Sequence, residues 1–328
     1  MPGKRRKKYD WKKYNKELVN RGKKLANEIK TLQKETVELW NEELERMNQG
    51  KEGRKFQYPH SMIVFFSILK SAFNIRSYRN LEGLGLLFFD KVPDYTRINR
   101  RIRQMDLEVL EEINKETTKA KTKGRIIDIS MDGTGVQVNG KYVWTDRKHK
   151  KEKMRRRDWR KINIAIDVET RQIVGIKVLG RNEAEGSHKN TMDLVENTLE
   201  NIADDSGISK AYADGGYDNE DNFRILENLG IKPIIRIREP SRKKAEEMSR
   251  ALITKKRRKF FKKKRSKEAL KQFDWERYVE DSKYGTRSGV EGVIGSFKRF
   301  FGESLFSRID DMIEREIMTR VLVWNIIV

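Results

Sequence analysis

The spacing of apolar side chains changes along the chain, from a helical period to an alternating one. In the N-terminal third, apolar positions recur every three or four residues, which predicts a long polar helix over 10–49 and a helical bundle over 56–119. Farther along, Ile127, Ile129 and Met131 alternate with polar residues, as they do in a half-buried strand. The chain is therefore expected to have a helical N-terminal region followed by a region built on a sheet.

The second region mixes strands and helices. Alternating runs predict a first strand over 126–138 and a hairpin formed by 161–168 and 172–179. The elements predicted after the hairpin are a helix at 187–202, a strand at 208–214, a helix at 219–229, a strand at 231–237, and helices at 287–301 and 310–328. Antiparallel strands followed by alternating helices and strands predict an α/β fold whose mixed sheet is covered on both faces.

Positive charge is concentrated in three segments. The 328 residues include 73 Lys and Arg against 50 Asp and Glu, which gives a net charge of +23. Residues 1–30, 147–161 and 239–271 together carry +28, so the other 250 residues carry −5. Basic appendages on a slightly acidic body are typical of a protein that binds nucleic acid or another polyanion. The alternative is that they only aid solubility, although a solubility surface normally mixes both signs.

The composition excludes several kinds of site. There is no cysteine, and the histidines are His60, His149 and His188, so disulfides, thiolate metal sites and a cysteine nucleophile are excluded. A hard cation would have to be bound by carboxylates. No apolar run approaches the roughly 20 residues that cross a bilayer, and no apolar signal region follows the basic N-terminus. We therefore expect a cytoplasmic protein that does not bind membranes.

Two aspartates are each followed by glycines at the predicted ends of strands. Asp132 precedes the sequence Gly-Thr-Gly, and Asp214 precedes Gly-Gly. Strand ends expose side chains in a mixed α/β sheet, and glycine lets a bulky anion approach the backbone. Because two neighbouring carboxylates repel each other, a divalent cation would favour their close approach. The pair is a candidate metal site.

A third carboxylate lies on the helix predicted near the C-terminus. At about 100° per residue, four side chains share a stripe roughly 60° wide, namely Tyr284, Arg287, Glu291 and Lys298. An apolar arc beside this stripe is predicted to face the sheet. For the helix taken alone, the alternative is a surface ion pair between Arg287 and Glu291 at i,i+4.

A short helix rich in arginine is predicted in the N-terminal region. It follows Pro93 and carries four arginines, Arg97, Arg100, Arg101 and Arg103. A short basic helix after a tight turn in a helical bundle suits helix-turn-helix binding to DNA. We expect DNA contacts from Arg97, Arg100 and Arg101; the alternative is ordinary helix packing with an arginine-rich outer face.

The three carboxylates, in this order along the chain, resemble the DDE triad of the transposases of prokaryotic insertion sequences. The spacing Tyr-x2-Arg-x3-Glu-x6-Lys around Glu291 matches the YREK signature of one large group of these enzymes. The contexts MDGTG at Asp132 and YADGGYD at Asp214 are also similar to those of the group. The stretch YPHSMIVFFSILKSAFNIRSYRNLEGLGLLF, followed by VPDYTRINRRI, is similar to their helical end-binding region. The resemblance covers roughly residues 55–328.

The resemblance implies a ribonuclease-H-like catalytic domain, with which the predicted element order is compatible. It implies a helical DNA-end-binding domain over 55–120 and a catalytic domain over 121–328 that contains a basic insertion at 239–275. A basic helical arm at 1–54 precedes them. The implied partner is double-stranded DNA, at the element ends and in the target, bound by a homodimer on paired ends. We expect such a protein to associate with the nucleoid.

The resemblance also implies two-metal phosphoryl transfer. Asp132 would bridge two Mg²⁺ ions, for which Mn²⁺ substitutes, and Asp214 and Glu291 would each complete one of the two sites. Arg287 and Lys298 would contact phosphates near the cleaved end, and Tyr284 would contact or stack near it. The predicted activity is cleavage at the terminal inverted repeats followed by strand transfer.

Other classes of protein remain open. A nuclease without strand transfer would use the same carboxylates. A DNA-binding protein derived from a transposase would have lost catalysis, but it is disfavoured because every signature position is intact. An RNA-binding structural protein would explain the basic segments but not the carboxylates.

Overall fold

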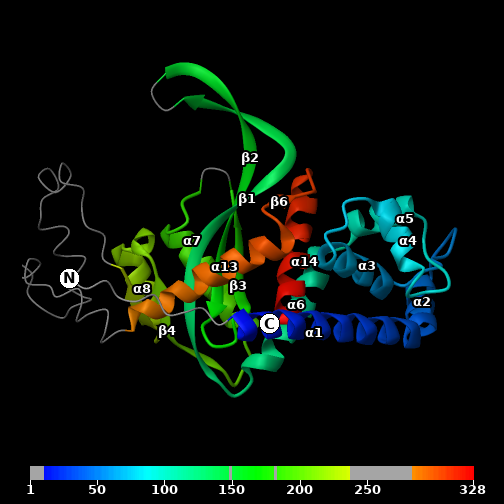
Figure 1. The fold of residues 1–328 in the computed structure, drawn as a ribbon, viewed down its shortest axis with the longest axis horizontal. Coiled ribbons are helices and arrows are strands. Elements are labelled where there is room, and N and C mark those ends of the chain that lie inside the picture. The colour runs from blue at the N-terminus through cyan, green and yellow to red at the C-terminus, as the bar shows by residue number, and fades with distance from the viewer. Residues whose placement is uncertain (1–10, 148–149, 181–182, 237–282) are drawn as a thin grey trace, which may run out of the picture. The chain divides into compact units, whose positions relative to one another are not determined.

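A computed structural model describes most of the chain as two compact units (Figure 1). One unit comprises Met1–Leu110 and Met318–Val328, and the other comprises Glu111–Ile317. The residues described are 11–147, 150–180, 183–236 and 283–328. The basic insertion predicted over 239–275 lies outside the described residues, as do the first ten residues of the predicted arm.

The first unit is a helical bundle around an aromatic core. Its helices are α1 (Trp11–Glu38), α2 (Trp40–Asn48), α3 (His60–Ala72), α4 (Tyr78–Gly85), α5 (Tyr95–Gln104) and the first turn of α6 (Leu107–Thr122). Helix α3 is buried along nearly its whole length, and the rings of Phe65 and Phe89 meet edge to face with centroids 5.1 Å apart. The helical pattern predicted over 56–119 is confirmed.

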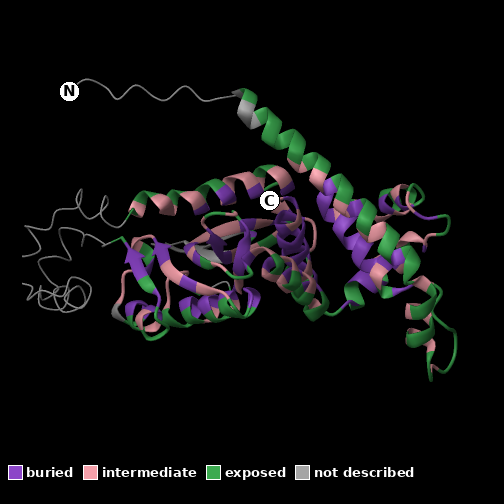
Figure 2. Ribbon diagram, turned by 90° about the horizontal axis from the view of Figure 1, so that it is seen from below, coloured by how far each residue is buried: buried purple, intermediate pink, exposed green. Residues whose placement is uncertain are grey.

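The long helix predicted over 10–49 is interrupted at Leu39, where α1 gives way to α2. In the part of α1 whose side chains are described, Leu25, Ile29 and Thr36 are buried, whereas Leu18 is 45% exposed. Figure 2 shows α1 exposed over most of its surface. Its apolar stripe is too narrow to bury more of the helix, as the sequence indicates.

The second unit contains a mixed sheet of six strands. They are β1 (Ile126–Arg147), β2 (Lys150–Asp167), β3 (Ile173–Leu179), β4 (Gly207–Ala213), β5 (Lys232–Ile235) and β6 (Ser304–Leu305). The strand order is β3-β2-β1-β4-β5, and β6 pairs with β1. The β1–β2 and β2–β3 pairs are antiparallel, and the other pairs are parallel. This is the mixed, ribonuclease-H-like sheet predicted from the sequence.

Helices cover both faces of this sheet. The remaining elements are α7 (His188–Asn201), α8 (Glu220–Asn228), α13 (Ser288–Phe301) and the 3₁₀ turns η1 (Gly215–Tyr217) and η2 (Tyr284–Arg287). The last helix, α14 (Asp310–Ile327), begins in this unit and belongs to the first unit from Met318 on. Met131 of β1 belongs to a buried cluster that includes Leu194 of α7 and Leu226 of α8. The preceding residue, Ser130, points to the opposite face of the sheet. Its hydroxyl donates to the carbonyl of Arg287 at 3.2 Å.

The first strand is longer than predicted, and the basic segment 147–161 is largely strand. Strand β3 pairs with β2 only from Lys161 onwards. In the part of β2 before Lys161, β1 and β2 pair with each other and form a long hairpin, to which only the short β6 adds a pairing with β1 (Figure 1). The sequence hides this strand because its many charged residues leave little apolar alternation over 147–161. The segment is not uniformly exposed either, since Asp158 is 1% exposed.

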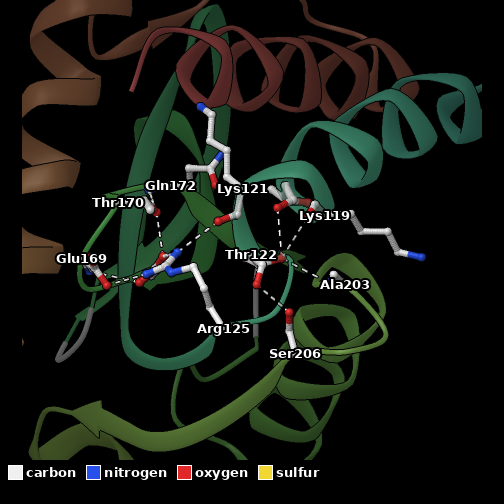
Figure 3. Close-up of polar contacts among 11 residues, drawn as sticks. Lys119, Lys121, Thr122, Arg125, Glu169, Thr170, Gln172, Ala203 and Ser206 are labelled. Atoms are coloured by element: carbon white, nitrogen blue, oxygen red, sulfur yellow. Dashed lines mark hydrogen bonds and ion pairs between the residues drawn. The ribbon is translucent and has the colours of Figure 1, made fainter.

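Polar contacts fix the start of β1, the strand that carries Asp132 (Figure 3). The hydroxyl of Thr122, at the end of α6, accepts a hydrogen bond of 3.0 Å from the backbone N–H of Ala203. Arg125 donates to the carboxylates of Asp167 at 2.9 Å and Glu169 at 2.6 Å. The strand is thereby joined to the β2–β3 turn and to the loop before β4.

Among the helices of the described residues, none is long and apolar enough to span a membrane.

Candidate active site

Two carboxylates lie side by side where the parallel pairing of β1 and β4 stops. Met131 and Ala213 form the last pair of that ladder, so Asp132 and Asp214 are the next residues of two neighbouring strands. Such strands lie about 4.8 Å apart. Asp214 ends its strand as predicted, and its carboxylate accepts a hydrogen bond of 2.7 Å from the N–H of Gly216. The sequence correctly predicted this juxtaposition.

Asp132, in contrast, does not end its strand. The prediction that Asp132 lies at the end of a strand is wrong, because Asp132 pairs with Ile164 and Gly133 with Asn163 as β2 continues alongside. The carboxylate of Asp132 accepts a hydrogen bond of 2.8 Å from the N–H of Gly133. The glycine provides space, since a Cβ at Gly133 would lie 2.6 Å from a carboxylate oxygen of Glu185.

The third carboxylate, Glu291, comes from the first turn of α13. The predicted α-helical stripe is only partly present: Tyr284 and Arg287 belong to the 3₁₀ turn η2, and the α-helix begins at Ser288. The hydroxyl of Tyr284 donates to the carbonyl of Ala213 at 3.4 Å, which ties η2 to the end of β4. Lys298 lies farther along α13 and is half-buried.

The side chain of Arg287 connects two of the three carboxylates. Its Nη1 lies 3.8 Å from Oδ2 of Asp132, and its Nη2 donates a short hydrogen bond to Oε1 of Glu291. The side chain of Arg287 is 18% exposed and that of Asp132 is 21% exposed, so this contact is shielded from water. The i,i+4 ion pair that the sequence allowed as a surface feature is present, and it also reaches the strand.

Negative charge is concentrated around Asp132. Burial raises the pKa of Asp132, and the nearby carboxylates of Asp214 and Glu291 raise it further, against the opposing effects of the Gly133 N–H and Arg287. Burial tends to lower the pKa of Arg287, but its bond to Glu291 and the nearby charges of Tyr284, Glu291 and Asp132 together outweigh burial, and the pKa is raised. The site thus favours binding of additional positive charge.

Sequence reasoning missed two residues at this site. Glu185, in the loop before α7, places its carboxylate against the backbone of Gly133. Tyr217 is 2% exposed, and its hydroxyl has no hydrogen-bond partner in the part of the chain that the structure describes. Burial raises the pKa of Tyr217, and the charges of Asp132, Asp214 and Glu185 add to this effect. Tyr217 lies within the quoted context YADGGYD, but no sequence signal marks Glu185.

The chemistry of these side chains fits a hard divalent cation, which prefers carboxylate oxygens. Asp132 and Asp214 supply two neighbouring ligands, whereas Glu291 bonds to Arg287. Within the ranges that the structure describes, no three acidic or histidine side chains are gathered closely enough to hold one ion. The site therefore brings together two of the three expected ligands and holds the third beside them.

The arginine-rich helix predicted in the N-terminal unit is α5. Asp94 caps it by accepting a hydrogen bond of 3.0 Å from the N–H of Arg97. Arg100 is exposed, Arg97 is half-buried, and Arg101 is only 8% exposed. Arg101 therefore does not lie on the outer face, because it shares the inner face of α5 with the buried Ile98.

Comparisons with known proteins give one family match. Residues 91–326 match the family described as "Transposase DDE domain". The Drosophila P element transposase strand transfer complex is 11% identical, with a TM-score of 0.31 over 89% of this chain and 70% of that one. The Mos1 transposase paired-end complex with left transposon end is also 11% identical, with a TM-score of 0.22 over 76% and 82% of the two chains. TM-scores this low do not establish a shared arrangement.

Proposed function

The chain belongs to the DDE transposase family, and we propose that it cleaves DNA at the terminal inverted repeats of its mobile element and joins the ends to target DNA. The observation that carries the proposal is the meeting of Asp132 and Asp214 on adjacent strands, with Glu291 held beside them through Arg287. DDE transposase domains generally use divalent metal ions. We propose two Mg²⁺ ions here, with Mn²⁺ as a substitute.

In this proposal the carboxylates hold the ions. Asp132, Asp214 and Glu291 would be the residues that hold them. When bound, divalent ions lower the pKa of an attacking water or 3′-hydroxyl and stabilise the leaving oxygen of an in-line displacement. The attacking oxygen forms a bond to phosphorus as the bond to the leaving oxygen breaks, so the chain needs no nucleophile of its own.

Arg287 exchanges partners in this scheme. Its guanidinium leaves the carboxylates and binds a phosphate near the cleaved end, where a planar fork of donors matches the phosphate oxygens. The bond between Ser130 and the Arg287 carbonyl does not involve the guanidinium, so the backbone of η2 can stay in place. Lys298 and Tyr284 are proposed to contact the same DNA end.

The proposed partner is double-stranded DNA in the nucleoid, bound by a homodimer on paired ends. The net charge of +23 supports a polyanion as ligand. In the sequence, much of this charge lies in segments other than those that carry the three carboxylates, so DNA binding and metal-dependent chemistry are expected to be separable.

The test is a cleavage and joining assay with the full chain. DNA that carries the flanking sequences of the gene would be incubated with Mg²⁺ or Mn²⁺, beside Asp132→Asn, Asp214→Asn and Glu291→Gln. The matched control is Asp128→Asn, which removes a carboxylate on β1 that pairs with Lys210 at 3.5 Å instead. We expect end cleavage and joining from the wild type and the control, none from the three site variants, and DNA binding from all.

A DNA-binding protein that has lost catalysis is the second candidate. The observation that favours it is the commitment of Glu291 to Arg287, with no complete set of three ligands among the described residues. Tight DNA binding without metal-dependent cleavage would select this candidate. Cleavage without joining would identify a nuclease, and nicking retained by one site variant would remove that residue from the metal site.

A further inference from the structure

The N-terminal unit contains a pocket of about 320 Å³ that is lined largely by cations. It lies between the segment that connects α2 to α3 and the helix α5. Six of its lining residues are basic: Lys51, Arg54, Lys55, Arg97, Arg100 and Arg101. None of its lining residues is acidic, so a bound anion would meet no carboxylate in the wall.

Arg101 is the buried cation of this pocket. It is 8% exposed, its Nη1 donates a short hydrogen bond to the carbonyl of Tyr58, and its Nη2 has no hydrogen-bond partner among the described residues. A buried charged group is costly unless it is paired and hydrogen-bonded. The carboxylate of Glu43 is near enough to attract the charge of Arg101, but it makes no hydrogen bond to Nη2 and instead caps α3 by accepting from the N–H groups of His60 at 2.7 Å and Ser61 at 3.0 Å. An acceptor from a bound ligand would complete the hydrogen bonding of the Arg101 guanidinium.

The aromatic side chains in the wall are already in contact with cations. Lys51 lies 4.9 Å and Arg101 lies 5.4 Å from the ring centre of Phe56, and Arg97 lies 5.9 Å from that of Tyr58. These rings position the positive charges. The pocket is therefore suited to a phosphate more than to a stacked base.

We propose that this pocket binds a backbone phosphate of double-stranded DNA, with the guanidinium of Arg101 at its base. Six cations exceed the charge of a single phosphate, and the exposed Arg54, Lys55 and Arg100 extend the positive surface to the rim, as a chain of successive phosphates requires. The inference rests on the proposed function only in taking DNA as the source of the phosphate. Phosphate contacts of this kind position a protein on DNA without reading its sequence.

The first test measures how the affinity for DNA depends on salt. The full chain, without metal, would be titrated onto a labelled duplex from the flanking sequence at several NaCl concentrations. Loss of one phosphate contact reduces the slope of log K against log salt by about 0.9. We expect this reduction for Arg100→Gln, and a loss of affinity of about tenfold for Arg101→Lys, which keeps the charge but not the planar fork.

The matched control is Arg103→Gln, which removes an equal charge from the same helix outside the pocket. We expect this variant to keep the wild-type slope and affinity. Equal losses in all three variants would show a diffuse basic face and overturn the proposal. If Arg101→Lys fails to fold, Arg54→Gln at the exposed rim takes its place beside Arg100→Gln.

A second measurement separates DNA from small phosphates. The melting temperature would be compared in inorganic phosphate and in chloride at equal ionic strength. We expect phosphate to stabilise the wild type and Arg103→Gln, and to have a smaller effect on Arg101→Lys. Stabilisation by inorganic phosphate together with unchanged DNA affinity in every pocket variant would overturn DNA as the ligand. Failure of the proposed catalysis would leave both measurements unaffected, since neither uses metal or cleavage.

Discussion

Arg287, in the turn before α13, lies 3.8 Å from Asp132 in the middle of β1, measured between Nη1 and Oδ2. The same guanidinium bonds to Glu291. One cation thus balances two of the three carboxylates of the candidate site. A metal ion that binds these carboxylates must compete with Arg287, so the affinity of the site for metal depends on this residue.

Replacing Arg287 by Gln tests that competition. We expect Arg287→Gln to bind Mn²⁺ several-fold more tightly, because the carboxylates lose their internal cation, in isothermal titration calorimetry of the full chain. End cleavage should nevertheless fall by about tenfold or more, the effect of losing one charge-assisted hydrogen bond to DNA. Arg299→Gln, on the exposed side of the same helix, is the control for lost charge. Weaker Mn²⁺ binding by Arg287→Gln would contradict the competition.

The pH dependence of stability follows from the raised pKa of Asp132, caused by burial and by the charges of Asp214 and Glu291. The folded chain holds this proton more tightly than the unfolded chain, whose ordinary value is 3.8. Ionised Asp132 therefore destabilises the fold above its folded pKa, and the penalty disappears as the pH falls below the unfolded value.

With a chelator present, we expect Asp132→Asn to raise the melting temperature at pH 7 by about 2–4 °C, the shift that a kcal/mol gives in a domain of this size. The gain should shrink towards pH 4, where the wild-type carboxyl is protonated. Asp128→Asn should show no such gain, because it loses an ion pair with Lys210. An increase that is independent of pH would mean that the charge of Asp132 is not its cause.

Gly186 shows how tightly the loop before α7 packs against the end of β4. A Cβ at this position would lie 2.2 Å from the carbonyl oxygen of Gly216, within the turn that Asp214 caps. Because that atom is backbone and cannot rotate away, we expect Gly186→Ala to lower the free energy of unfolding by about 2–3 kcal/mol in urea denaturation.

Gly207 and Gly133 provide control substitutions for Gly186→Ala. Gly207→Ala should be close to neutral, since nothing lies within 4 Å of its Cβ position. Gly133→Ala should have a smaller effect on stability than Gly186→Ala, because the group it meets is the flexible carboxylate of Glu185. Similar losses in all three variants would show a general effect of glycine replacement and not of the close contact.

The sequence predicted the site best where apolar alternation leads directly to a polar residue. Asp132 and Asp214 follow runs whose alternate residues are buried, so the two strands could be inferred, although only β4 ends at this point. Glu185 could not be found in this way, because its place against Gly133 depends on tertiary packing of a loop. The helix predicted over 287–301 is α13, but the predicted stripe extended helical spacing back to Tyr284, which lies in a 3₁₀ turn, because the two kinds of helix have similar patterns over four residues.

The burial of Arg101 could have been inferred from its neighbours. Ile98 and Ile102 lie three residues before it and one after it, and both are buried, so the helical period places Arg101 beside the core. The four arginines of α5 suggested a uniformly basic helix, which hid the burial of Arg101. The long hairpin of β1 and β2 was hidden for a related reason, since its charged residues mask the strand pattern.

The buried carboxylate of Asp158 is expected to stabilise the base of the hairpin formed by β1 and β2. It is 1% exposed, and both its carboxylate oxygens lie 3.2 Å from Nη1 of Arg160, with Nζ of Lys141 at 3.7 Å. Asp158→Asn removes the buried carboxylate, but Arg160 keeps its ion pair with the exposed Asp310, so we expect the free energy of unfolding to fall by about 1–3 kcal/mol. Urea denaturation of the full chain measures this directly.

Asp310 provides the matched comparison, because it also pairs with Arg160 but its side chain is 68% exposed. Asp310→Asn should cost about 1 kcal/mol or less, as exposed ion pairs do. The double variant Asp158→Asn with Arg160→Met should recover much of the loss, since it removes the buried charge together with its partner. If Asp158→Asn costs no more than Asp310→Asn, the basic hairpin is held by its backbone pairing alone, and the buried ion pair adds nothing to its stability.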